Sequence, residues 1–586
     1  MRAAHKPADV GTGAICASFD SSSAAWLSVG MAHLRHGFVE LSALPPFDDS
    51  LRGDPVATRR HRLAMTEAAH AFLVVELDGS PPALDLRVAD VDAPAWSGAG
   101  VTVVASAEPS GAICQRWSIP RSAGQVRVRL RGRLDRPSLA EITELNPPSP
   151  TGATTTLEPA DGAVTVSAPA LPATQVVTVR GAPIDWARVG GELVGTVRPM
   201  GRDPLELEIV VATPGVSAMP VVTTREPDRL AARAVAYVRG CTALRVADGE
   251  RAILTDHRIL PLSWTRDAYW QALALLAANA PGDRERVADH LRWLWRRCER
   301  PDGRWVRSHH ANGGRKDLAF QADQQLYPFV ELADYWRLTG ELPAGVDWRP
   351  ALETTWAVTM DAIDPDNGLI ASTETAADDP AAAPFIAASQ VLLWYAAERL
   401  AEVAPVASID PAGIADAARQ ARDAFARHHA DGADPWAYAV DGRGLRVAYH
   451  DANDLPTALA PLWGFCAADD PGWRATMEFA SSPANPAWFA GHRAGLGSVH
   501  SPGTWTLGDL QAWLRARLVG DRQQAAAALA RLDEAAFSDG MLPEAYGSDA
   551  ETRIRHWFAW PGAALAALRI LDRDGRLEPM LAVARR

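Results

Sequence analysis

The sequence predicts a two-domain protein of the β + α type, with an N-terminal antiparallel β-sandwich over residues 1–225 and an (α/α)6 barrel over residues 226–586. Three observations support this prediction. A chain of 586 residues is too long for one hydrophobic core. The spacing of apolar residues changes near Glu226, and short segments rich in aromatic and acidic residues recur only after that point.

In the first domain, apolar and polar residues alternate with a period of two, which is typical of half-buried strands. Turn residues such as Asp-Gly-Ser separate the alternating runs, and most of the intervals are too short for a helix. This pattern favours an antiparallel sandwich. The predicted strands lie within residues 72–79, 84–91, 101–106, 125–134, 163–168, 174–181 and 205–213.

In the second domain, apolar residues recur at helical spacing in many segments punctuated by Gly, Pro and Asp. The predicted helices lie within residues 228–238, 266–278, 286–298, 323–340, 385–403, 509–520, 522–536 and 561–573. Loops at 263–267, 320–324 and 375–379 precede helices at intervals of about 55 residues, which fits one helical hairpin per interval. A closed toroid of six hairpins would gather these loops at one end, whereas a solenoid would spread them along a surface.

Composition narrows the range of partners and locations. The net charge of −13 disfavours nucleic acid and anionic membranes. The five scattered cysteines indicate neither a disulfide framework nor a metal site, and no cofactor motif is present. The start of the chain lacks an apolar signal segment, and no run is long enough to span a membrane. We therefore expect a soluble, cytoplasmic protein.

Tryptophans point to a carbohydrate ligand. All but four of the 21 tryptophans follow residue 260, and many lie in the predicted loops beside acids. Indole rings stack on the C–H faces of sugar rings, so Trp264 and Trp557 are candidate substrate contacts, although burial in the core is the alternative for any single tryptophan. A glycoside is therefore the expected substrate.

Hydrolysis of a glycosidic bond requires one carboxylic acid to protonate the leaving oxygen and a second to act on water or on the anomeric carbon. Glu544 lies in a loop among apolar and aromatic residues, a setting that tunes a carboxylate, and the alternative is a structural ion pair with Arg553 or Arg555. The adjacent Asp378 and Asp379 precede a helix, where an Asp often serves only as an N-cap. Glu374 lies close by and competes with them.

Four further polar residues are candidates for binding sugar hydroxyls. Asp267 and Asp323 each lie at a predicted helix start, so capping is the alternative role for both. Asn453 lies in the sequence HDANDLP, and His500 in a loop flanked by glycines. These residues and the candidate acids together predict one polar pocket at the end of the barrel.

Several ordered motifs over roughly residues 250–575 resemble glycoside hydrolase family 125, whose known activity is exo-acting α-1,6-mannosidase. They are the segments 260–271, 322–340, 375–394, 450–459, 496–503 and 540–565. The resemblance implies an inverting, metal-independent mechanism in which the acid is Asp378 or Asp379 and Glu544 is the base. It also implies that Arg266 joins Asp267, Asp323, Asn453 and His500 around the terminal sugar.

The chain departs from the family motifs beside the acids. Thr375-Ala376-Ala377 replaces Arg-Pro-Ser, and Pro543-Glu544-Ala545-Tyr546 replaces His-Glu-Ser-Phe. The combination of sandwich and barrel also resembles the glucoamylase-type enzymes of family 15. In that case Glu374 would be the acid and Glu544 the base, and the substrate would be an α-glucoside.

Three hypotheses follow from the sequence. The first is an inverting exo-α-glycosidase, with an α-mannoside ahead of an α-glucoside as substrate. The second is a carbohydrate phosphorylase or non-catalytic sugar-binding protein. A phosphorylase needs a basic phosphate site and a single acid. The third is a helical scaffold whose tryptophan-rich loops bind another protein. The sandwich carries no catalytic constellation, and we expect it to pack against the barrel rather than to cover the mouth.

Overall fold

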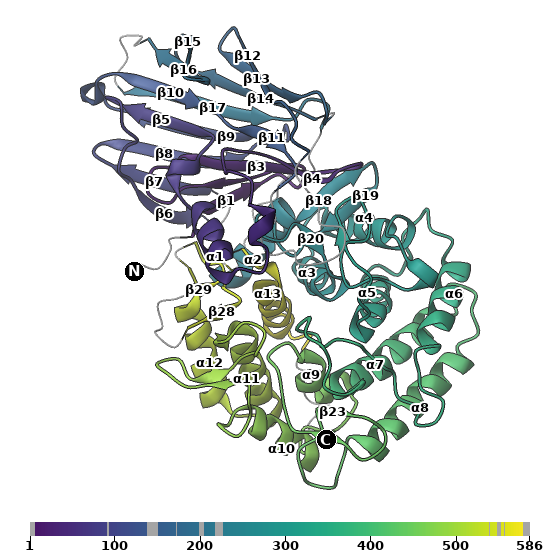
Figure 1. Ribbon diagram of the computed structural model, residues 1–586. Coiled ribbons are helices and arrows are strands. Elements are labelled where there is room, and N and C mark those ends of the chain that lie inside the picture. The colour runs from purple at the N-terminus through teal and green to yellow at the C-terminus, as the bar shows by residue number, and fades with distance from the viewer. Residues whose placement is uncertain are drawn as a thin grey trace.

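The computed structural model describes residues 6–90, 93–137, 151–171, 173–198, 204–216, 227–537, 539–547, 553–555 and 557–577. Its N-terminal half consists of antiparallel strands, and its C-terminal half is a ring of helices (Figure 1). Among the described helices, none combines the length and apolar character needed to cross a membrane.

Two large antiparallel sheets form the N-terminal half. The first has the strand order β1-β2-β3-β5-β10-β16-β15, with β4 paired to β3 and β11 paired to β4. Its strands are β1 (Ala8–Gly11), β2 (Cys16–Phe19), β3 (Trp26–His33), β4 (Gly37–Ser42), β5 (Leu73–Leu77), β10 (Val126–Leu130), β11 (Arg133–Asp135), β15 (Ile184–Val189) and β16 (Glu192–Val197). One α-helix, α1 (Pro55–Ala64), lies between β4 and β5, with a short 3-10 turn on either side.

The second sheet has the order β12-β13-β14-β17-β9-β8-β7-β6. Its strands are β6 (Asp85–Asp90), β7 (Ala93–Gly98), β8 (Val101–Ala107), β9 (Ile113–Ile119), β12 (Thr156–Ala160), β13 (Ala163–Ala168), β14 (Ala173–Arg180) and β17 (Leu205–Ala212). Residues along β13 and β14 alternate between buried and half-buried, as expected where one face of a sheet is packed.

The buried faces of the two sheets share one core, which contains Trp26 of the first sheet and Trp96 and Trp117 of the second. Gln115 is fully buried within it, and its side-chain oxygen accepts hydrogen bonds from the indole nitrogens of Trp26 (2.8 Å) and Trp117 (2.9 Å). The core therefore has a satisfied polar centre, as a buried amide requires.

In the C-terminal half, six helices contact one another in cyclic order, and the last closes on the first. These inner helices are α3 (Thr265–Ala278), α5 (Ala322–Thr339), α7 (Ala387–Val403), α9 (Leu455–Trp463), α11 (Thr506–Val519) and α13 (Ala559–Arg573). The outer helices are α2 (Arg229–Tyr237), α4 (Asp283–Arg296), α6 (Trp348–Met360), α8 (Ala412–His428), α10 (Pro471–Ala480) and α12 (Arg522–Ala535).

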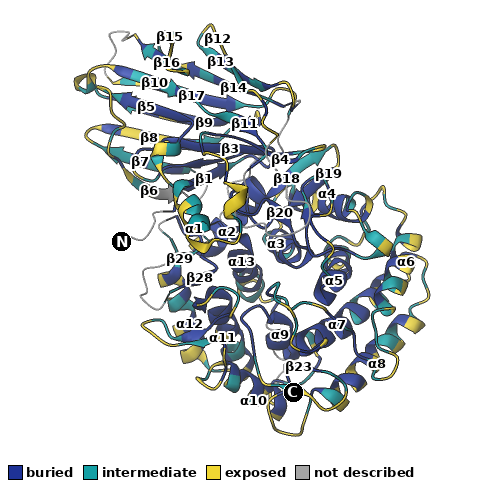
Figure 2. Cartoon of the chain, in the orientation of Figure 1, coloured by how far each residue is buried: buried dark blue, intermediate teal, exposed yellow. Residues whose placement is uncertain are grey.

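Burial distinguishes the two layers of the ring (Figure 2). In α12, the buried residues are Ala525, Ala528, Leu532 and Ala535, which form one face at helical spacing. In α7, nearly every residue of the first three turns is buried. Outer helices thus bury one face against the inner ring, whereas inner helices are enclosed on most sides.

Short strands connect the helices. They are β18 (Ala243–Ala247), β19 (Glu250–Ile253), β20 (Leu262–Ser263), β21 (His309–His310), β22 (Phe385–Ile386), β23 (Ala439–Val440), β24 (Arg446–Val447), β25 (Trp488–Phe489), β26 (Gly495–Leu496), β27 (Thr504–Trp505), β28 (Ala545–Tyr546) and β29 (Arg553–Ile554). Three of them, β20, β22 and β27, lead into the N-termini of the inner helices α3, α7 and α11.

Most of the predicted elements are confirmed. Each predicted strand overlaps an observed one, and each predicted helix overlaps an observed helix. Among the strands of the two sheets, the prediction missed β1–β4, β7, β9, β12, β15 and β16. Among the α-helices, it missed α1, α6, α8, α9 and α10. The sheets have a hydrophobic core of their own, and among the described residues the core of the ring includes only five buried ones that precede residue 225, which fits a boundary near that residue. These five are Cys16, Ala32, Phe38, Leu44 and Met65. That boundary itself stays a prediction, because residues 217–226 lie outside the described part.

The sheets pack directly on the ring, as expected, at a crossing of two glycines. Gly11 at the end of β1 meets Gly240 in the π-helical turn Val238–Thr242 that follows α2. A Cβ on Gly240 would come within 2.5 Å of the Gly11 carbonyl oxygen, and one on Gly11 within 2.1 Å of the Gly240 oxygen. Gly13 also donates a backbone hydrogen bond to Gly240 (2.9 Å). Only glycines permit this approach.

We therefore expect Gly240→Ala to lower the free energy of unfolding by about 1–3 kcal/mol, because one chain must move away from the other. Urea unfolding measures the change. The matched control is Gly413→Ala in α8, where a Cβ would meet no atom within 4 Å. This control should leave stability unchanged or raise it by about 0.4–1 kcal/mol. Equal effects of both substitutions would contradict the proposed tight crossing.

Candidate active site

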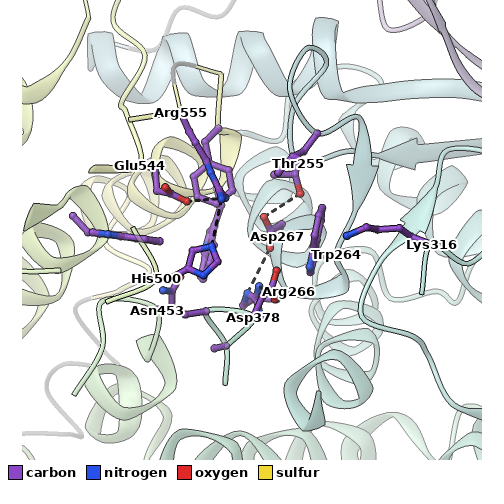
Figure 3. A pocket seen from close by; sticks show the side chains of 16 residues that line it. Thr255, Trp264, Arg266, Asp267, Lys316, Asp378, Asn453, His500, Glu544 and Arg555 are labelled. Carbon is purple, nitrogen blue, oxygen red and sulfur yellow. Dashed lines mark hydrogen bonds and ion pairs between the residues drawn. The ribbon is translucent and has the colours of Figure 1, made fainter. Parts of the chain in front are cut away.

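A cavity of about 230 Å³ opens at the end of the ring where the inner helices begin. Its walls come from the N-terminal turns of the inner helices and from the loops that lead into them (Figure 3). The lining residues are Thr255, Leu260, Trp264, Arg266, Asp267, Lys316, Ala376, Ala377, Asp378, Asn453, His500, Trp505, Glu544, Arg555, Phe558 and Trp560.

Glu544 lies immediately before β28, and its backbone is held on both sides. Its N–H donates to the Ile554 carbonyl (3.0 Å), and its carbonyl accepts from the Thr506 N–H (3.1 Å) at the start of α11. The side chain is 1% exposed and forms an ion pair with Arg555, with 3.0 Å between Oε1 and Nη1. The guanidinium thus compensates a buried negative charge at the cavity wall.

His500 connects this wall to Asp379. Arg555 donates from Nη2 to Nε2 of His500 (3.3 Å), and Nδ1 of His500 donates to the Asp379 carboxylate (3.2 Å). Burial opposes the imidazolium, as does Arg555, but the hydrogen bond to Asp379 and the negative charges of Glu544 and Asp379 together outweigh them and raise the pKa of His500. Glu544, Arg555, His500 and Asp379 therefore form one polar chain.

Asp378 lies on another wall of the cavity, across from Glu544 (Figure 3). Its Oδ1 accepts a hydrogen bond from Nε2 of Gln321 (2.6 Å) and lies 3.7 Å from Nη2 of Arg266. Because Oδ1 is occupied by a donor, a proton on this carboxyl group would reside on Oδ2.

Two cavity residues have left-handed backbone conformations. The φ angles of Asp378 and Arg555 are +65° and +52°, a region that residues other than glycine seldom adopt. Such conformations cost free energy and persist where surrounding contacts hold them in place. At Asp378 the turn is closed by a hydrogen bond from its own N–H to the Thr375 carbonyl (3.1 Å).

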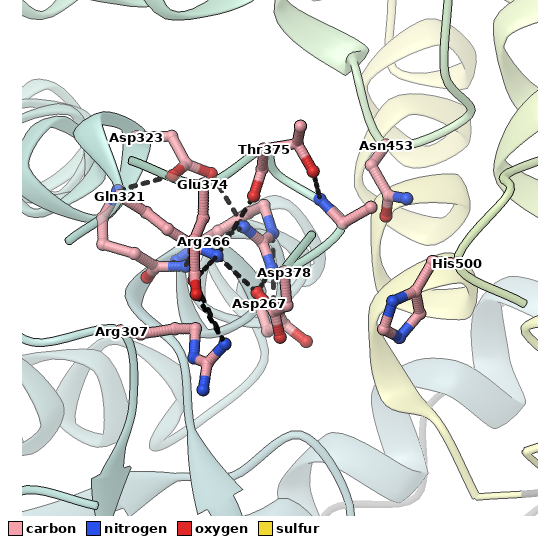
Figure 4. A network of polar contacts seen from close by, with 12 residues as sticks. Arg266, Asp267, Arg307, Gln321, Asp323, Glu374, Thr375, Asp378, Asn453 and His500 are labelled. Carbon is pink, nitrogen blue, oxygen red and sulfur yellow. Dashed lines mark hydrogen bonds and ion pairs between the residues drawn. The ribbon is translucent and has the colours of Figure 1, made fainter. Parts of the chain in front are cut away.

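Arg266 joins the acids on the Asp378 side (Figure 4). Its Nη1 donates to Asp323 (2.8 Å), and its guanidinium lies 4.9 Å from the centre of the Trp560 ring. Asp267 follows it, is buried, and accepts a hydrogen bond from Thr255 (3.1 Å). Burial raises the pKa of Asp267 to about 7 despite the opposing charge of Arg266.

Glu374 takes a different position from Asp378. It is half-buried, forms an ion pair with Arg307 (3.1 Å), and accepts a hydrogen bond from Gln321 (3.3 Å). Burial, together with the nearby Asp378 carboxylate, raises the pKa of Glu374 against the charge of Arg307. Glu374 is not among the residues that line the cavity.

The structure brings most of the predicted site residues together. Those that line the cavity are Trp264, Arg266, Asp267, Asp378, Asn453, His500 and Glu544. Asp323 and Asp379 each lie one contact away, against Arg266 and His500 respectively. Trp557 does not line the cavity: its indole nitrogen donates to Asp9 of β1 (3.1 Å), and its side chain is fully buried.

Other lining residues were not among the predicted site residues: Lys316, Trp560, and Arg555, which was expected only as a possible partner of Glu544. Lys316 is buried, and its ammonium lies 5.7 Å from the centre of the Trp264 ring. A signal was present, since the chain has only two lysines among 58 basic residues, Lys6 and Lys316. Within the described residues, no group of three or more His, Cys, Asp or Glu side chains is arranged to hold a metal ion.

Comparison with known proteins gives a family match to part of the chain. The model of the metal-independent α-mannosidases of glycoside hydrolase family 125 matches residues 350–570. This segment contains Asp378, Asn453, His500 and Glu544, whereas Arg266 and Asp267 precede it. No curated protein sequence matches the chain.

Two solved structures are similar in fold. A metal-independent α-mannosidase of Streptococcus pneumoniae, in a non-productive complex with α-1,6-mannobiose, matches with a TM-score of 0.51 and 18% identity. The match covers 59% of this chain and 93% of that one. A bacterial glucoamylase in complex with acarbose matches with a TM-score of 0.64 and 12% identity, covering 100% of this chain and 96% of the other.

The raised pKa of Asp267 has a consequence for stability. The pKa of Asp267 is about 7 in the folded protein and about 3.9 in the unfolded chain. Between pH 4 and pH 7 the folded state therefore binds a proton that the unfolded state has released. The contribution of Asp267 to stability therefore falls as the pH rises through this window. We expect the difference in melting temperature, Asp267→Asn minus wild type, to be roughly 1–3 °C more positive at pH 8 than at pH 5.

Differential scanning fluorimetry at the two pH values measures this gain. Asp54→Asn is the control, since Asp54 is an exposed carboxylate that caps α1, and Asn also caps helices. Its melting temperature should keep a constant offset from the wild type. A constant offset for Asp267→Asn as well would contradict the burial effect.

Proposed function

Since this chain is a glycoside hydrolase with a family 125-like region, we propose that it is an inverting, exo-acting α-glycosidase, with Asp378 as the acid and Glu544 as the base. The observation that carries the proposal is that these two carboxyl groups line one cavity from opposite walls. Hydrolysis with inversion needs one carboxyl group on each side of the anomeric carbon.

The surroundings of the three candidate acids favour Asp378. The proton donor must reach the glycosidic oxygen, and of the three candidates only Asp378 lines the cavity. Asp379 binds His500, and Glu374 is engaged by Arg307. We therefore assign to Asp378 the transfer of a proton from Oδ2 to the leaving oxygen as the bond to the anomeric carbon breaks.

Glu544 has the surroundings of a base. Its pairing with Arg555 favours the carboxylate over the carboxylic acid, and a carboxylate can take a proton from water as the water attacks. In an inverting enzyme the two carboxyl groups are about 6.5–9.5 Å apart, which leaves room for this water. We expect the separation of Asp378 and Glu544 to fall in that range.

The size of the cavity supports exo action. A volume of about 230 Å³ lies below the ~300 Å³ at which typical ligand pockets begin, so the site suits a single terminal sugar better than an internal stretch of a chain. Trp264, Trp505 and Trp560 supply aromatic surface, and Asn453 and Asp267 supply polar groups for sugar hydroxyls. In this proposal the closed ring of helices is an (α/α)6 barrel, and the two sheets are a β-sandwich packed on its side.

The leading substrate is an α-mannoside, of the α-1,6 type. The match of residues 350–570 to the family of α-mannosidases supports this choice, because the segment carries both proposed catalytic carboxyl groups. An α-glucoside is the second candidate, supported by the similarity over the whole chain to a bacterial glucoamylase. That alternative would make Glu374 the acid.

Substitution of the carboxyl groups tests the mechanism. We expect Glu544→Gln and Asp378→Asn each to lower kcat by a factor of about 10³ or more on substrates with poor leaving groups, because each removes a proton-transfer group. Asp378→Asn should lose far less on an aryl glycoside whose leaving group needs no proton. Steady-state kinetics on both substrate types measures the difference.

The matched controls are Asp379→Asn and Glu374→Gln, which remove neighbouring carboxylates. We expect a smaller loss for both, without the dependence on the leaving group. If Glu374→Gln instead shows that dependence, the acid is Glu374 and the glucoamylase-type alternative gains support. Full activity of Glu544→Gln would end the proposal.

A substrate screen tests the specificity. We expect hydrolysis of α-1,6-mannobiose to exceed hydrolysis of α-linked glucose disaccharides at least tenfold in kcat/KM, with β-mannose as the first product anomer. Proton NMR during the first minutes of turnover identifies the sugar and the anomer. Release of the α anomer would contradict inversion, and a requirement for phosphate with release of a sugar phosphate would indicate a phosphorylase.

A further inference from the structure

A buried cluster of charged residues joins β1 of the first sheet to the ring. Lys6 donates hydrogen bonds to Asp9 and to Asp539 (2.7 Å), and all three side chains are buried. The second oxygen of Asp9 accepts hydrogen bonds from Ser18 of β2 (2.7 Å) and from the indole nitrogen of Trp557 (3.1 Å).

His257 extends the cluster into the segment that precedes α3. Its Nε2 lies 3.0 Å from Oγ of Ser18 and 3.4 Å from Asp9, and its Nδ1 lies 2.8 Å from the hydroxyl of Tyr237 in α2. Arg233 of α2 donates to the Asp9 carbonyl (3.3 Å) and lies 3.4 Å from Asp539. From the ring, Trp557 and His257 thus contact the buried carboxylate of Asp9, and Arg233 contacts its backbone carbonyl.

These contacts reach three segments that also form the cavity wall. Asp539 lies five residues before Glu544, and Trp557 lies two residues after Arg555. His257 lies two residues after Thr255, which lines the cavity, donates to Asp267 and accepts a backbone hydrogen bond from Ala559 (3.0 Å). The cluster therefore contacts both arms of the loop that carries the Glu544–Arg555 pair. One arm leads from Asp539 to Glu544, and the other contains Arg555 and Trp557.

The charges in the cluster favour a fixed geometry. Burial opposes the ionisation of Asp9, but Lys6 and the hydrogen bond from His257 outweigh it, so the pKa of Asp9 is lowered. Asp9 is then a charged acceptor, and charged acceptors form the stronger hydrogen bonds. A rearrangement that separated the buried pair would leave an uncompensated charge, which is strongly unfavourable.

We propose that Asp9 and Lys6 of the N-terminal half are positioning residues for Glu544 and Arg555, and that Trp557 transmits this restraint to the Arg555 arm. The inference rests on the proposed function only for the role of Glu544 as the base. It gives the sheets a part in catalysis although none of the described residues that line the cavity belongs to them. It also gives Trp557 a role other than the stacking on sugar expected from the sequence.

The substitution Trp557→Phe tests the inference. It removes the indole N–H that bonds to Asp9 and keeps an aromatic ring in the core. The matched control is Trp26→Phe, which removes an indole hydrogen bond to buried Gln115 within the sheets, away from the cavity. Asp539→Asn tests the other arm, because it removes the charge that faces Lys6 while an oxygen can still accept from the Met541 N–H.

Hydrogen–deuterium exchange provides a readout that needs no substrate. In Trp557→Phe and Asp539→Asn we expect faster exchange in residues 539–547 and 553–560, with little change in α7 and α8 on the opposite side of the ring. Trp26→Phe should leave exchange in those two segments at the wild-type rate. Unchanged exchange in both test variants would overturn the inference, even if neither variant were active.

Kinetics separates positioning from general loss of stability. The probes are the α-D-mannosyl and α-D-glucosyl fluorides and the matching 4-nitrophenyl glycosides, and fluoride leaves without protonation. A displaced base should lower kcat roughly tenfold on both the fluoride and the aryl glycoside, with KM within about twofold. Trp26→Phe should keep the wild-type kcat.

The outcomes distinguish this inference from the proposed function. If Glu544→Gln abolishes hydrolysis of the fluoride but Trp557→Phe and Asp539→Asn keep the wild-type kcat, the inference is wrong and the proposed base stands. If Glu544→Gln retains activity, the proposed function fails. In that case, faster exchange in the two arms would still establish the restraint from β1, but without a catalytic base to position.

Discussion

The closure of α13 on α3 is the constraint on which the site depends. The two helices pack along each other, and this contact joins the end of the chain's helical half to its beginning. Because the inner helices all enter the ring from the same end, closure gathers their N-terminal turns and the preceding loops around one space. Residues as distant in sequence as Asp267 and Glu544 thereby line the same cavity.

Charge compensation then determines how each acid in that space behaves. Glu544 is paired with Arg555, whereas Asp378 is contacted mainly by the Gln321 amide, with Arg266 at longer range. Arg266 forms ion pairs with Asp267, Asp323 and Asp378, so these three acids share one cation. Such different partners are consistent with the different roles in proton transfer that we propose for the two carboxyl groups.

The sheets contribute more than a second core. They meet the ring at the wall that carries the Glu544 loop, through the crossing of Gly11 with Gly240 and through the buried cluster around Asp9. A second link lies nearby, where Arg258 donates to Glu40 of β4 (2.8 Å) and its guanidinium lies over the Trp557 ring. Close packing and buried ion pairs thus both connect the sheets to this wall of the cavity.

Local patterns in the sequence were sufficient to predict much of the fold. Alternation and helical spacing report which face of an element is buried, so strands such as β13 and helices such as α12 were predictable. The helices α9 and α10 escaped detection because they are short, and α9 contains Pro461 and is buried on most sides, which removes the amphipathic period. Strands β1–β4 are buried almost throughout, so their alternation is weak.

The site, like the fold, has features that the sequence predicts and features that only the tertiary structure shows. Loops that combine acids, tryptophans and glycines before helices were enough to predict Glu544, the Asp378–Asp379 pair and most of the polar residues around them. Residue type could not separate Asp378 from Asp379 or Glu374, because the distinction lies in which side chain turns toward the cavity. Arg555 lies near Glu544 in the sequence, but other partners, such as Asp9 for Trp557 or His500 for Asp379, come from segments far apart in the chain and meet only through long-range packing.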